Sequence, residues 1–460
     1  MNRRTNNQLN VKEQMLKLLF VHRNLNAYQL YFLLNNDTIP MSYPIWDNSL
    51  INMNKVRSNY NQLSQLEKLG FIMESSKVQP RQYTLTAEGL SQVYQLFDIP
   101  EIEGFIRPGW DQNYGYFPYE LFKPTSERLQ KHHQLTTDFH ILMRMLSHKY
   151  NFKYDFIDNR YAAVPYDVIK DDYNTSRIFR PDGEIKIQTK TGTKHFWLEI
   201  DMGTEKSNLL TEKFEKYAEY LDYISVGVND NELANTMPDG IIFLTKALRN
   251  IWARNQNVYR SFKNSIGRWD NYLNLIVTNL ETAENVIMSV LEREKNWSIL
   301  NEQLLTFIQD RRFKGQPNNL KTSFCSLHQH EIDILGFQPR FTIVNGSQMN
   351  SLLLYINYEQ YETNGLSKAL HFFNMVQTRK IDSIAKANIG EIIPVLLFNK
   401  NKPKILSFEG CNEEGLLKEV FRKHLWCELT SNAWYDMNAQ LIDLAQHNPL
   451  LYYSQLKTRF

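Results

Sequence analysis

The sequence predicts a mixed α/β protein with several domains. Three observations predict it. Apolar residues recur at helical spacing in the first hundred residues, two strand-like runs flank a polar turn within residues 71–86, and strands alternate with helices after residue 178. At 460 residues, 42% apolar and 22% charged, the chain is long enough to bury more than one hydrophobic core.

Three helices and a hairpin are expected in residues 1–100. Apolar spacing predicts helices over 11–22, 27–34 and 54–69, the last of them ended by Gly70 as a C-cap. The segment FIMESSKVQPRQYTLT predicts two strands around a turn, and TAEGLSQVYQLF predicts another helix. Helix, helix, helix and hairpin is the order of a winged helix-turn-helix, so a DNA-binding domain of this type is predicted for residues 1–100.

The third predicted helix is the candidate for contact with DNA. Its apolar stripe consists of Val56, Tyr60, Leu63 and Leu66. The opposite face carries side chains that can reach phosphates and base edges, and the hairpin adds two basic residues. We assign DNA binding to Lys55, Arg57, Ser58, Asn61, Gln62, Gln65, Lys77 and Arg81. The alternative is a solvated helix in a protein-interaction module.

The overall charge neither demands nor excludes nucleic acid. The net charge is +2, and residues 1–100 contain ten Lys or Arg against seven Asp or Glu. No apolar stretch approaches the roughly 18 residues of a membrane span, and the polar N-terminus predicts no secretory signal. Three cysteines are too few and too scattered for a disulfide framework, so a cytoplasmic location is expected.

Residues 101–130 are expected to form an ordered linker, because they are rich in Pro, Gly and aromatic residues without a clear period. A helix containing LQKHHQLTTDFHILMRML then opens a domain over residues 131–295. Its His132, His133 and His140 have no acidic or Cys residue at ligand spacing, so we expect them to cap and pack the helix. The set Cys325, His328 and His330 lacks a fourth ligand nearby and is also expected to be structural.

Three acids on neighbouring strands form a candidate metal site. IFRPDGEIKIQ and HFWLEID predict a strand hairpin, which a helix and the strand DGIIFLT follow. Glu199 and Asp201 are two residues apart and point to the same face of an extended strand, where they repel each other unless a cation lies between them. Asp182 can add a third oxygen ligand. We predict a Mg²⁺ or Mn²⁺ site at these three acids; the alternative is a solvated edge strand.

The segments LQKHHQLTTDF, FRPDG, WLEIDMGTE, EKFEKYAEYL and DGIIFLT together resemble the replication-relaxation family of plasmid and mobile-element proteins, over roughly residues 10–290. This family is similar in pattern to the PD-(D/E)XK nuclease superfamily. The resemblance implies a restriction-endonuclease-like α/β domain in which Asp182 and Glu199 are metal ligands.

The sequence departs from the superfamily pattern at Asp201, which stands where a catalytic lysine is usual. That lysine would orient the attacking water and stabilise the developing charge. We expect its role to be missing or to be supplied by Lys213 or Lys216 on the following helix. Glu205 is either a further metal ligand or a helix-entry acid.

Residues 296–460 are predicted to form a second α/β domain. FQPRFTIVN, LYINYEQYETNGLSKALHFFNMVQ and PVLLF match FRPDGEIKI, LEIDMGTEKSNLLTEKFEKYAEYL and GIIFL in the same order. This is either a degenerate copy of the domain before it or a chance likeness. In a copy, Arg340, Tyr355 and Asn357 would replace Asp182, Glu199 and Asp201, and no divalent ion would be held there. Only one domain of the chain could then cut, which would favour a nick in one DNA strand.

The leading hypothesis is a DNA-binding protein of a plasmid or mobile element with a Mg²⁺-dependent nicking domain, acting in replication, relaxation or conjugative DNA processing. Its expected partners are double-stranded DNA and a relaxase or replication protein, and no membrane is expected. The sequence leaves the oligomeric state open, a dimer included. Two alternatives remain open. One is a non-catalytic accessory factor or transcriptional regulator, and the other is a defence-type restriction endonuclease.

Overall fold

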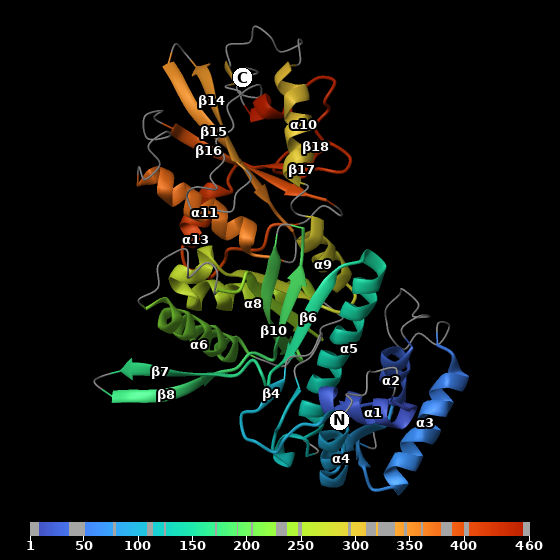
Figure 1. Cartoon of the computed structure of the whole chain (residues 1–460). Coiled ribbons are helices and arrows are strands. Elements are labelled where there is room, and N and C mark those ends of the chain that lie inside the picture. Colours follow the sequence, from blue (N-terminus) through green and yellow to red (C-terminus); the bar gives the residue numbers. More distant parts are fainter. Residues whose placement is uncertain are drawn as a thin grey trace. The chain divides into compact units, whose positions relative to one another are not determined.

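The computed structural model forms a mixed α/β protein, as predicted (Figure 1). It describes residues 9–35, 51–76, 80–107, 114–123, 126–170, 173–190, 192–203, 206–226, 237–246, 251–292, 296–309, 319–320, 336–344, 347–359, 362–378, 389–399 and 404–453. No helix within these ranges is both long and apolar enough to cross a membrane.

The chain divides into two compact units. One consists of Met1–Glu205, Tyr223–Asn250 and Thr278–Glu284, and the other of Lys206–Asp222, Ile251–Val277 and Asn285–Phe460. The domain boundaries expected at residues 100, 130 and 295 stay predictions. Residues 1–100 share the first unit with the candidate carboxylates.

The N-terminal helices and hairpin lie where the sequence predicts them. Their order is α1 (Val11–His22), β1 (Asn24–Leu25), α2 (Ala27–Leu34), α3 (Met53–Lys68), β2 (Ile72–Ser76), β3 (Gln82–Leu85) and α4 (Ala87–Phe97). Asn10 and Asn26 begin α1 and α2 with capping boxes, which satisfy backbone donors at each helix start. Local sequence signals therefore define these helices.

The short strand β1 was not predicted. It pairs antiparallel with β3, through Asn24 opposite Thr84 and Leu25 opposite Tyr83, and completes the sheet order β1-β3-β2. Two residues between two helices carry no periodic signal, so only the pairing with a distant strand reveals this element.

The described residues between 101 and 130 include several that pack into the N-terminal core. They contribute β4 (Ile106–Arg107), β5 (Tyr114–Gly115) and the 3-10 helix η2 (Tyr119–Leu121). Phe20 of α1 stacks on Phe122 at 5.5 Å and on Tyr114 at 6.4 Å between ring centroids. The aromatic residues of the predicted linker thus cover α1.

The candidate carboxylates lie on the sheet that follows α5 (Glu127–Tyr150). In this sheet β11 (Gly240–Thr245), β10 (Thr193–Asp201), β9 (Gly183–Gln188) and β6 (Lys153–Asp158) are neighbours in that order. β10 runs antiparallel to β9 and parallel to β11, and β9 runs antiparallel to β6. β7 (Val164–Lys170) and β8 (Tyr173–Phe179) form a separate two-stranded ribbon (Figure 1).

The other unit is built around a six-stranded sheet with the order β13-β14-β15-β16-β17-β18. The strands are β13 (Asn319–Leu320), β14 (Gly336–Val344), β15 (Ser347–Asn357), β16 (Ile389–Phe398), β17 (Leu425–Glu428) and β18 (Ala433–Tyr435). The helices from α6 onward are α6 (Ser207–Ser225), α8 (Ile251–Ser265), α9 (Ala283–Glu292), α10 (Asn296–Gln309), α11 (Asn364–Gln377) and α13 (Glu414–Val420). The remaining elements are the strand β12 (Asn274–Thr278) and the 3-10 helices η3 (Gly267–Asn271) and η6 (Pro449–Leu451).

The order antiparallel pair, helix, parallel strand occurs twice along the chain. β14 and β15 are antiparallel, α11 follows, and β16 pairs parallel with β15, as β9, β10, α6 and β11 do. The residue register corrects one expectation. Leu198 pairs with Gly183, but its aligned counterpart Leu354 pairs with Phe337.

This shift changes which residue occupies the position of Asp182. Gly183 follows Asp182, and Phe337 follows Gly336, so Gly336 and not Arg340 is the topological counterpart of Asp182. The two hairpins differ in register at their inner ends: Val344 pairs with Ser347, three positions on, whereas Gln188 pairs with Thr193, five positions on. Sequence alignment cannot detect such a shift when few residues are identical.

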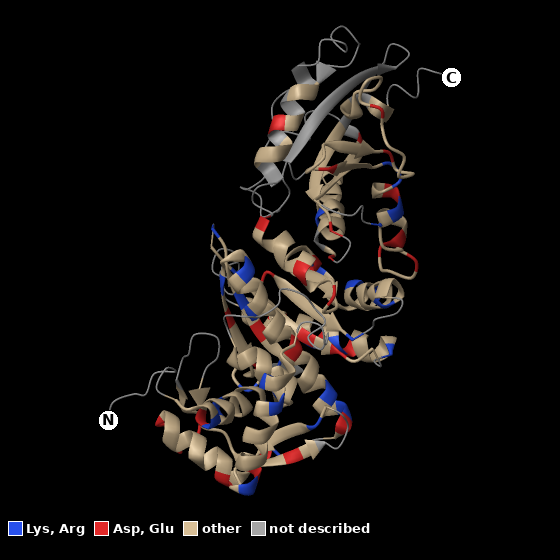
Figure 2. Ribbon diagram, turned by 90° about the vertical axis from the view of Figure 1, so that its right-hand side faces the viewer, with Lys and Arg blue, Asp and Glu red and all other residues tan. Residues whose placement is uncertain are grey.

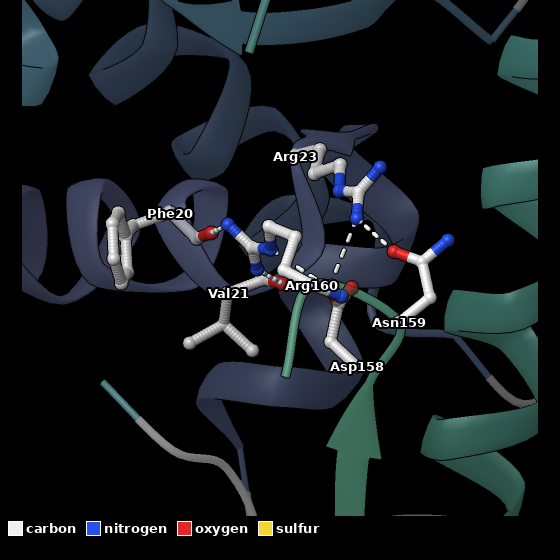
Figure 3. A network of polar contacts seen from close by, with 6 residues as sticks. All are labelled: Phe20, Val21, Arg23, Asp158, Asn159 and Arg160. Carbon is white, nitrogen blue, oxygen red and sulfur yellow. Dashed lines mark hydrogen bonds and ion pairs between the residues drawn. The ribbon is translucent and has the colours of Figure 1, made fainter. Parts of the chain in front are cut away.

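A buried ionic network joins α1 to the end of β6 (Figure 3). Arg160, with a side chain only 1% exposed, donates to Phe20 O at 3.1 Å, Val21 O at 2.8 Å and Asp158 Oδ1 at 2.7 Å. Arg23 donates to the same Asp158 oxygen at 2.9 Å and to Asn159 Oδ1. Burial alone would raise the pKa of Asp158, but the two guanidinium groups hold it well below its usual range.

Substituting Arg160 with Met should destabilise the protein by about 3 kcal/mol, because Asp158 and two helix carbonyls would lose a buried donor. Urea unfolding should show a lower midpoint. The matched control is Arg268→Met, since Arg268 is 66% exposed and pairs with Asp222, which is 58% exposed. Its effect should stay below about 1 kcal/mol. Equal effects of the two substitutions would contradict this account of the network.

The stability of the protein should depend on Asp138 between pH 4 and 7. This carboxyl is 1% exposed on α5, and Gln29 Nε2 of α2 donates to it at 2.8 Å. Burial raises its pKa from 3.8 to about 7. Because the folded state binds this proton more tightly, the stabilisation is complete below pH 3.8 and is lost as the pH rises towards 7.

Asp138→Asn should remove this pH dependence, which amounts to about 4 kcal/mol at most. Urea unfolding of both proteins at pH 5 and pH 8 measures it. Wild type should lose more stability than the variant between the two pH values, and parallel losses would refute the assignment to Asp138.

Candidate functional site

The exposed face of α3 carries the residues assigned to DNA binding. Its inner face is formed by Val56, Asn59, Leu63 and Leu66, all buried. Tyr60, predicted for this stripe, is half-buried and packs against the same core, and Asn59 joins the stripe with its Nδ2 donating to Ala27 O at 3.1 Å. The outward side chains are Lys55, Arg57, Ser58, Asn61 and Gln65, which are exposed, and Gln62, which is half-buried.

Two of the assigned basic residues have intramolecular contacts. Lys55 Nζ donates to Asn35 Oδ1 at 2.8 Å, which links α3 to the end of α2. Arg81, at the start of β3, lies 3.5 Å from Glu74 of β2 and is 54% exposed. Such an exposed ion pair costs little to break, so Arg81 can exchange it for a phosphate. Lys77 lies outside the described residues.

Charges of both signs are interspersed over the described helices and strands (Figure 2). This distribution agrees with a net charge of +2. A nucleic-acid interface in the described part of the chain must therefore rest on a local set of donors, such as the face of α3, and not on a strongly basic surface.

Asp182 lies just before β9 and is fixed to the neighbouring strand. Its Oδ2 accepts a hydrogen bond from Ile200 N at 2.8 Å and lies 3.1 Å from Nε2 of His132 on α5. Its side chain is 21% exposed and that of His132 is 19% exposed. Ile200 stands between Glu199 and Asp201, so this bond places Asp182 at the level of the other two acids.

Glu199 and Asp201 lie two residues apart on β10, and the two-residue period of a strand directs both to the same face. Glu199 is 4% exposed and Asp201 is fully buried. Both carboxylate oxygens of Asp201 are engaged by the chain: Oδ1 accepts from Gly203 N and Oδ2 from Thr245 Oγ1 of β11, each at 2.9 Å. Asp201 therefore closes the end of β10 onto β11.

The metal site predicted at the three carboxylates stays a prediction. Among the residues that the structure describes, no group of three His, Cys, Asp or Glu side chains could hold a metal ion. Asp201 is turned onto Thr245 and Gly203, which leaves Asp182 and Glu199 as candidate ligands. Mg²⁺ commonly binds through one or two carboxylates and keeps several waters, so these two acids fit it.

The proposed substitutes for a catalytic lysine lie on α6. Lys216 is exposed and Lys213 is half-buried beside the buried Phe214. α6 belongs largely to the second unit, so a migrated lysine stays a prediction. Glu205, Cys325, His328 and His330 lie outside the described residues.

The histidines of α5 divide into two kinds. His140 is 1% exposed and stacks on Phe156 at 4.6 Å, and burial lowers its pKa to about 3, which agrees with the predicted packing role. His132 instead contacts Asp182. Sequence reasoning missed this pair, because the two residues are 50 positions apart. The only available signal was the inclusion of LQKHHQ in the family pattern.

One comparison with known proteins gave a match. Residues 156–231 match the family described as Replication-relaxation. The match begins in β6, includes Asp182, Glu199 and Asp201, and is shorter than the likeness over residues 10–290 inferred from the sequence. No curated protein and no solved structure gave a significant match. The segment of the chain that carries the candidate carboxylates is thus the segment that matches the replication-relaxation family.

Proposed function

We propose that this chain is a double-stranded DNA-binding protein that acts in plasmid replication or relaxation. The observation that carries the proposal is the outward face of α3, where six polar or basic side chains stand opposite a fully packed inner face. A helix of this kind fits the major groove, where such side chains bind base edges and phosphates. The family match over residues 156–231 supports the role in replication.

The surrounding elements support a winged helix-turn-helix. α1, α2 and α3 precede the hairpin β2–β3, and β1 adds the third strand of its sheet. In this arrangement α3 is the recognition helix and the β2–β3 hairpin is the wing, with Arg81 placed for contact with the DNA backbone. The N-cap Asn52 fixes the start of α3 through hydrogen bonds from Asn54 N and Lys55 N.

A second candidate function, nicking of one DNA strand, rests on Asp182. Its bond to Ile200 N brings it beside the strand that presents Glu199, in the order of a PD-(D/E)XK site. A Mg²⁺ ion held by Asp182 and Glu199 would polarise a phosphate and supply a hydroxide nucleophile. In this scheme His132 orients Asp182, and Asp201 closes the strand end and does not replace the missing lysine.

The topology of the second unit favours nicking over double-strand cleavage. At the positions of Asp182, Glu199 and Asp201 it has Gly336, Tyr355 and Asn357, none of which is a carboxylate. If this unit is a degenerate copy, only one module could cut. The experiments below distinguish this function from the two alternatives, a non-catalytic accessory factor and a restriction endonuclease.

Arg57→Ala should weaken binding of duplex DNA by about 1–3 kcal/mol if Arg57 contacts a base. Fluorescence anisotropy at fixed salt concentration measures the dissociation constant. Arg268→Ala is the control, since it removes the same charge from an exposed arginine on η3. An unchanged affinity in the Arg57 variant, or an equal loss in the control, would remove α3 from the recognition role.

Supercoiled plasmid incubated with the protein and Mg²⁺ should be converted to open circles. Asp182→Asn and Glu199→Gln should abolish this, because each removes one ligand charge while preserving the size of the side chain. The control is Glu184→Gln on β9, the strand that Asp182 precedes, where Glu184 pairs with His195 at 3.1 Å as Asp182 pairs with His132. Its product should equal that of wild type.

Other products would identify the alternatives. Linear plasmid would indicate a restriction endonuclease. Plasmid that stays supercoiled while duplex DNA is bound would refute nicking and leave the proposed DNA-binding function in place.

A further inference from the structure

A small polar pocket lies in the first unit between the β2–β3 hairpin, the end of α1 and the start of α5. Its lining includes Arg23, Asn24, Ser75, Thr84, Lys123 and His133. The cavity volume is about 20 Å³, enough for a single oxygen-sized group. It is distinct from the exposed face of α3 and from Asp182 and Glu199.

Several polar atoms of this pocket have no hydrogen-bond partner within the described part of the chain. These are both side-chain atoms of Asn24, Oγ of Ser75 and Nε of Arg23. Asn24 is only 5% exposed. Buried polar atoms are nearly always paired, because an unpaired one loses its hydration without compensation, so the set indicates a missing ligand.

The charge of the pocket indicates what kind of ligand is missing. Arg23 and Arg160 share one carboxylate, Asp158, which leaves an excess positive charge at a buried position. Lys123, 55% exposed and paired with Glu120 at 3.3 Å, also lines the pocket, and of the described residues that line it none is acidic. A neutral water would satisfy the hydrogen bonds but would not balance this charge.

The neighbouring contacts hold the donors rigidly. Thr84 Oγ1 lies 2.8 Å from Arg23 O and 2.9 Å from Phe122 O, and Gln130 Nε2 donates to Ser75 O at 2.9 Å. Arg23 itself has a φ of 64°, a region that few non-glycine residues adopt. Burial lowers the pKa of its guanidinium, with Asp158 opposing the effect, so a second anion nearby would stabilise the charged form.

We propose that this pocket binds a phosphate group, with one phosphate oxygen inserted against Arg23, Asn24 and Ser75. The remaining oxygens stay at the mouth beside Lys123. The group is either a backbone phosphate of bound DNA or a free phosphate anion, which share this chemistry. Phosphate binding in this pocket depends neither on a metal ion held by Asp182 and Glu199 nor on base recognition by α3.

Inorganic phosphate tests the site directly in the full chain. The melting temperature of the wild type should rise with phosphate concentration, relative to sodium chloride at the same ionic strength. Asn24→Ala and Ser75→Ala should each weaken the apparent affinity about tenfold or more, because each removes a hydrogen bond to a charged group. Neither side chain loses a described hydrogen bond within the protein, so both variants should fold.

Ser265→Ala is the matched control, since Ser265 Oγ on α8 is also buried without a described partner but does not line the pocket. Its response to phosphate should equal that of wild type. A melting temperature that does not respond specifically to phosphate, or that responds equally in all four proteins, would show a hydrated pocket and overturn the proposal.

Duplex DNA distinguishes the two sources of phosphate. If saturating duplex abolishes the phosphate response, a backbone phosphate occupies the pocket, and if the response persists, the ligand is a free phosphate. Failure of DNA binding would leave the phosphate response intact, so the result is separable from the function proposed above.

Discussion

The buried guanidinium of Arg160 is the constraint on which the first unit depends. The last carbonyls of a helix have no partners within the helix, and a buried helix end needs donors from elsewhere. Arg160 supplies them to Phe20 and Val21, while its charge is balanced by Asp158. The rings of Phe20, Phe117 and Phe122 lie 5.1–5.4 Å from it. The α1 helix is thereby tied to β6, and the predicted DNA-binding domain and the carboxylate-bearing sheet form one unit.

Compensation of buried charge also determines the contacts of the three carboxylates. Two acids on one face of a buried strand repel each other unless something compensates their charge. Here Thr245 and Gly203 donate to Asp201, and Ile200 N and His132 contact Asp182. The chain thus compensates part of the charge that a cation would otherwise balance. This compensation leaves two acids, and not three, as the candidate ligands.

The proposed phosphate pocket differs from the carboxylate cluster in its hydrogen bonding. Near Arg23 several buried polar atoms have no described partner, whereas Asp182 is contacted by His132 and Ile200 N. His132 and His133 are adjacent on α5, and one contacts Asp182 while the other lines the pocket. A DNA strand carries phosphates at regular spacing, so one strand could provide both a bound phosphate and a cleavable one. This link rests on both proposals and requires no contact outside the first unit.

The sequence by itself determined what depends on near neighbours in the chain. The ends of α1, α2 and α3 follow from apolar spacing and caps, and the common face of Glu199 and Asp201 follows from the two-residue period of a strand. Tertiary structure alone decided the pairing of β1, the contact of His132 with Asp182 and the register that puts Gly336 in place of Arg340. These features join residues tens of positions apart, and local periodicity contains no information about such contacts. Burial and charge compensation select them only once the chain has folded.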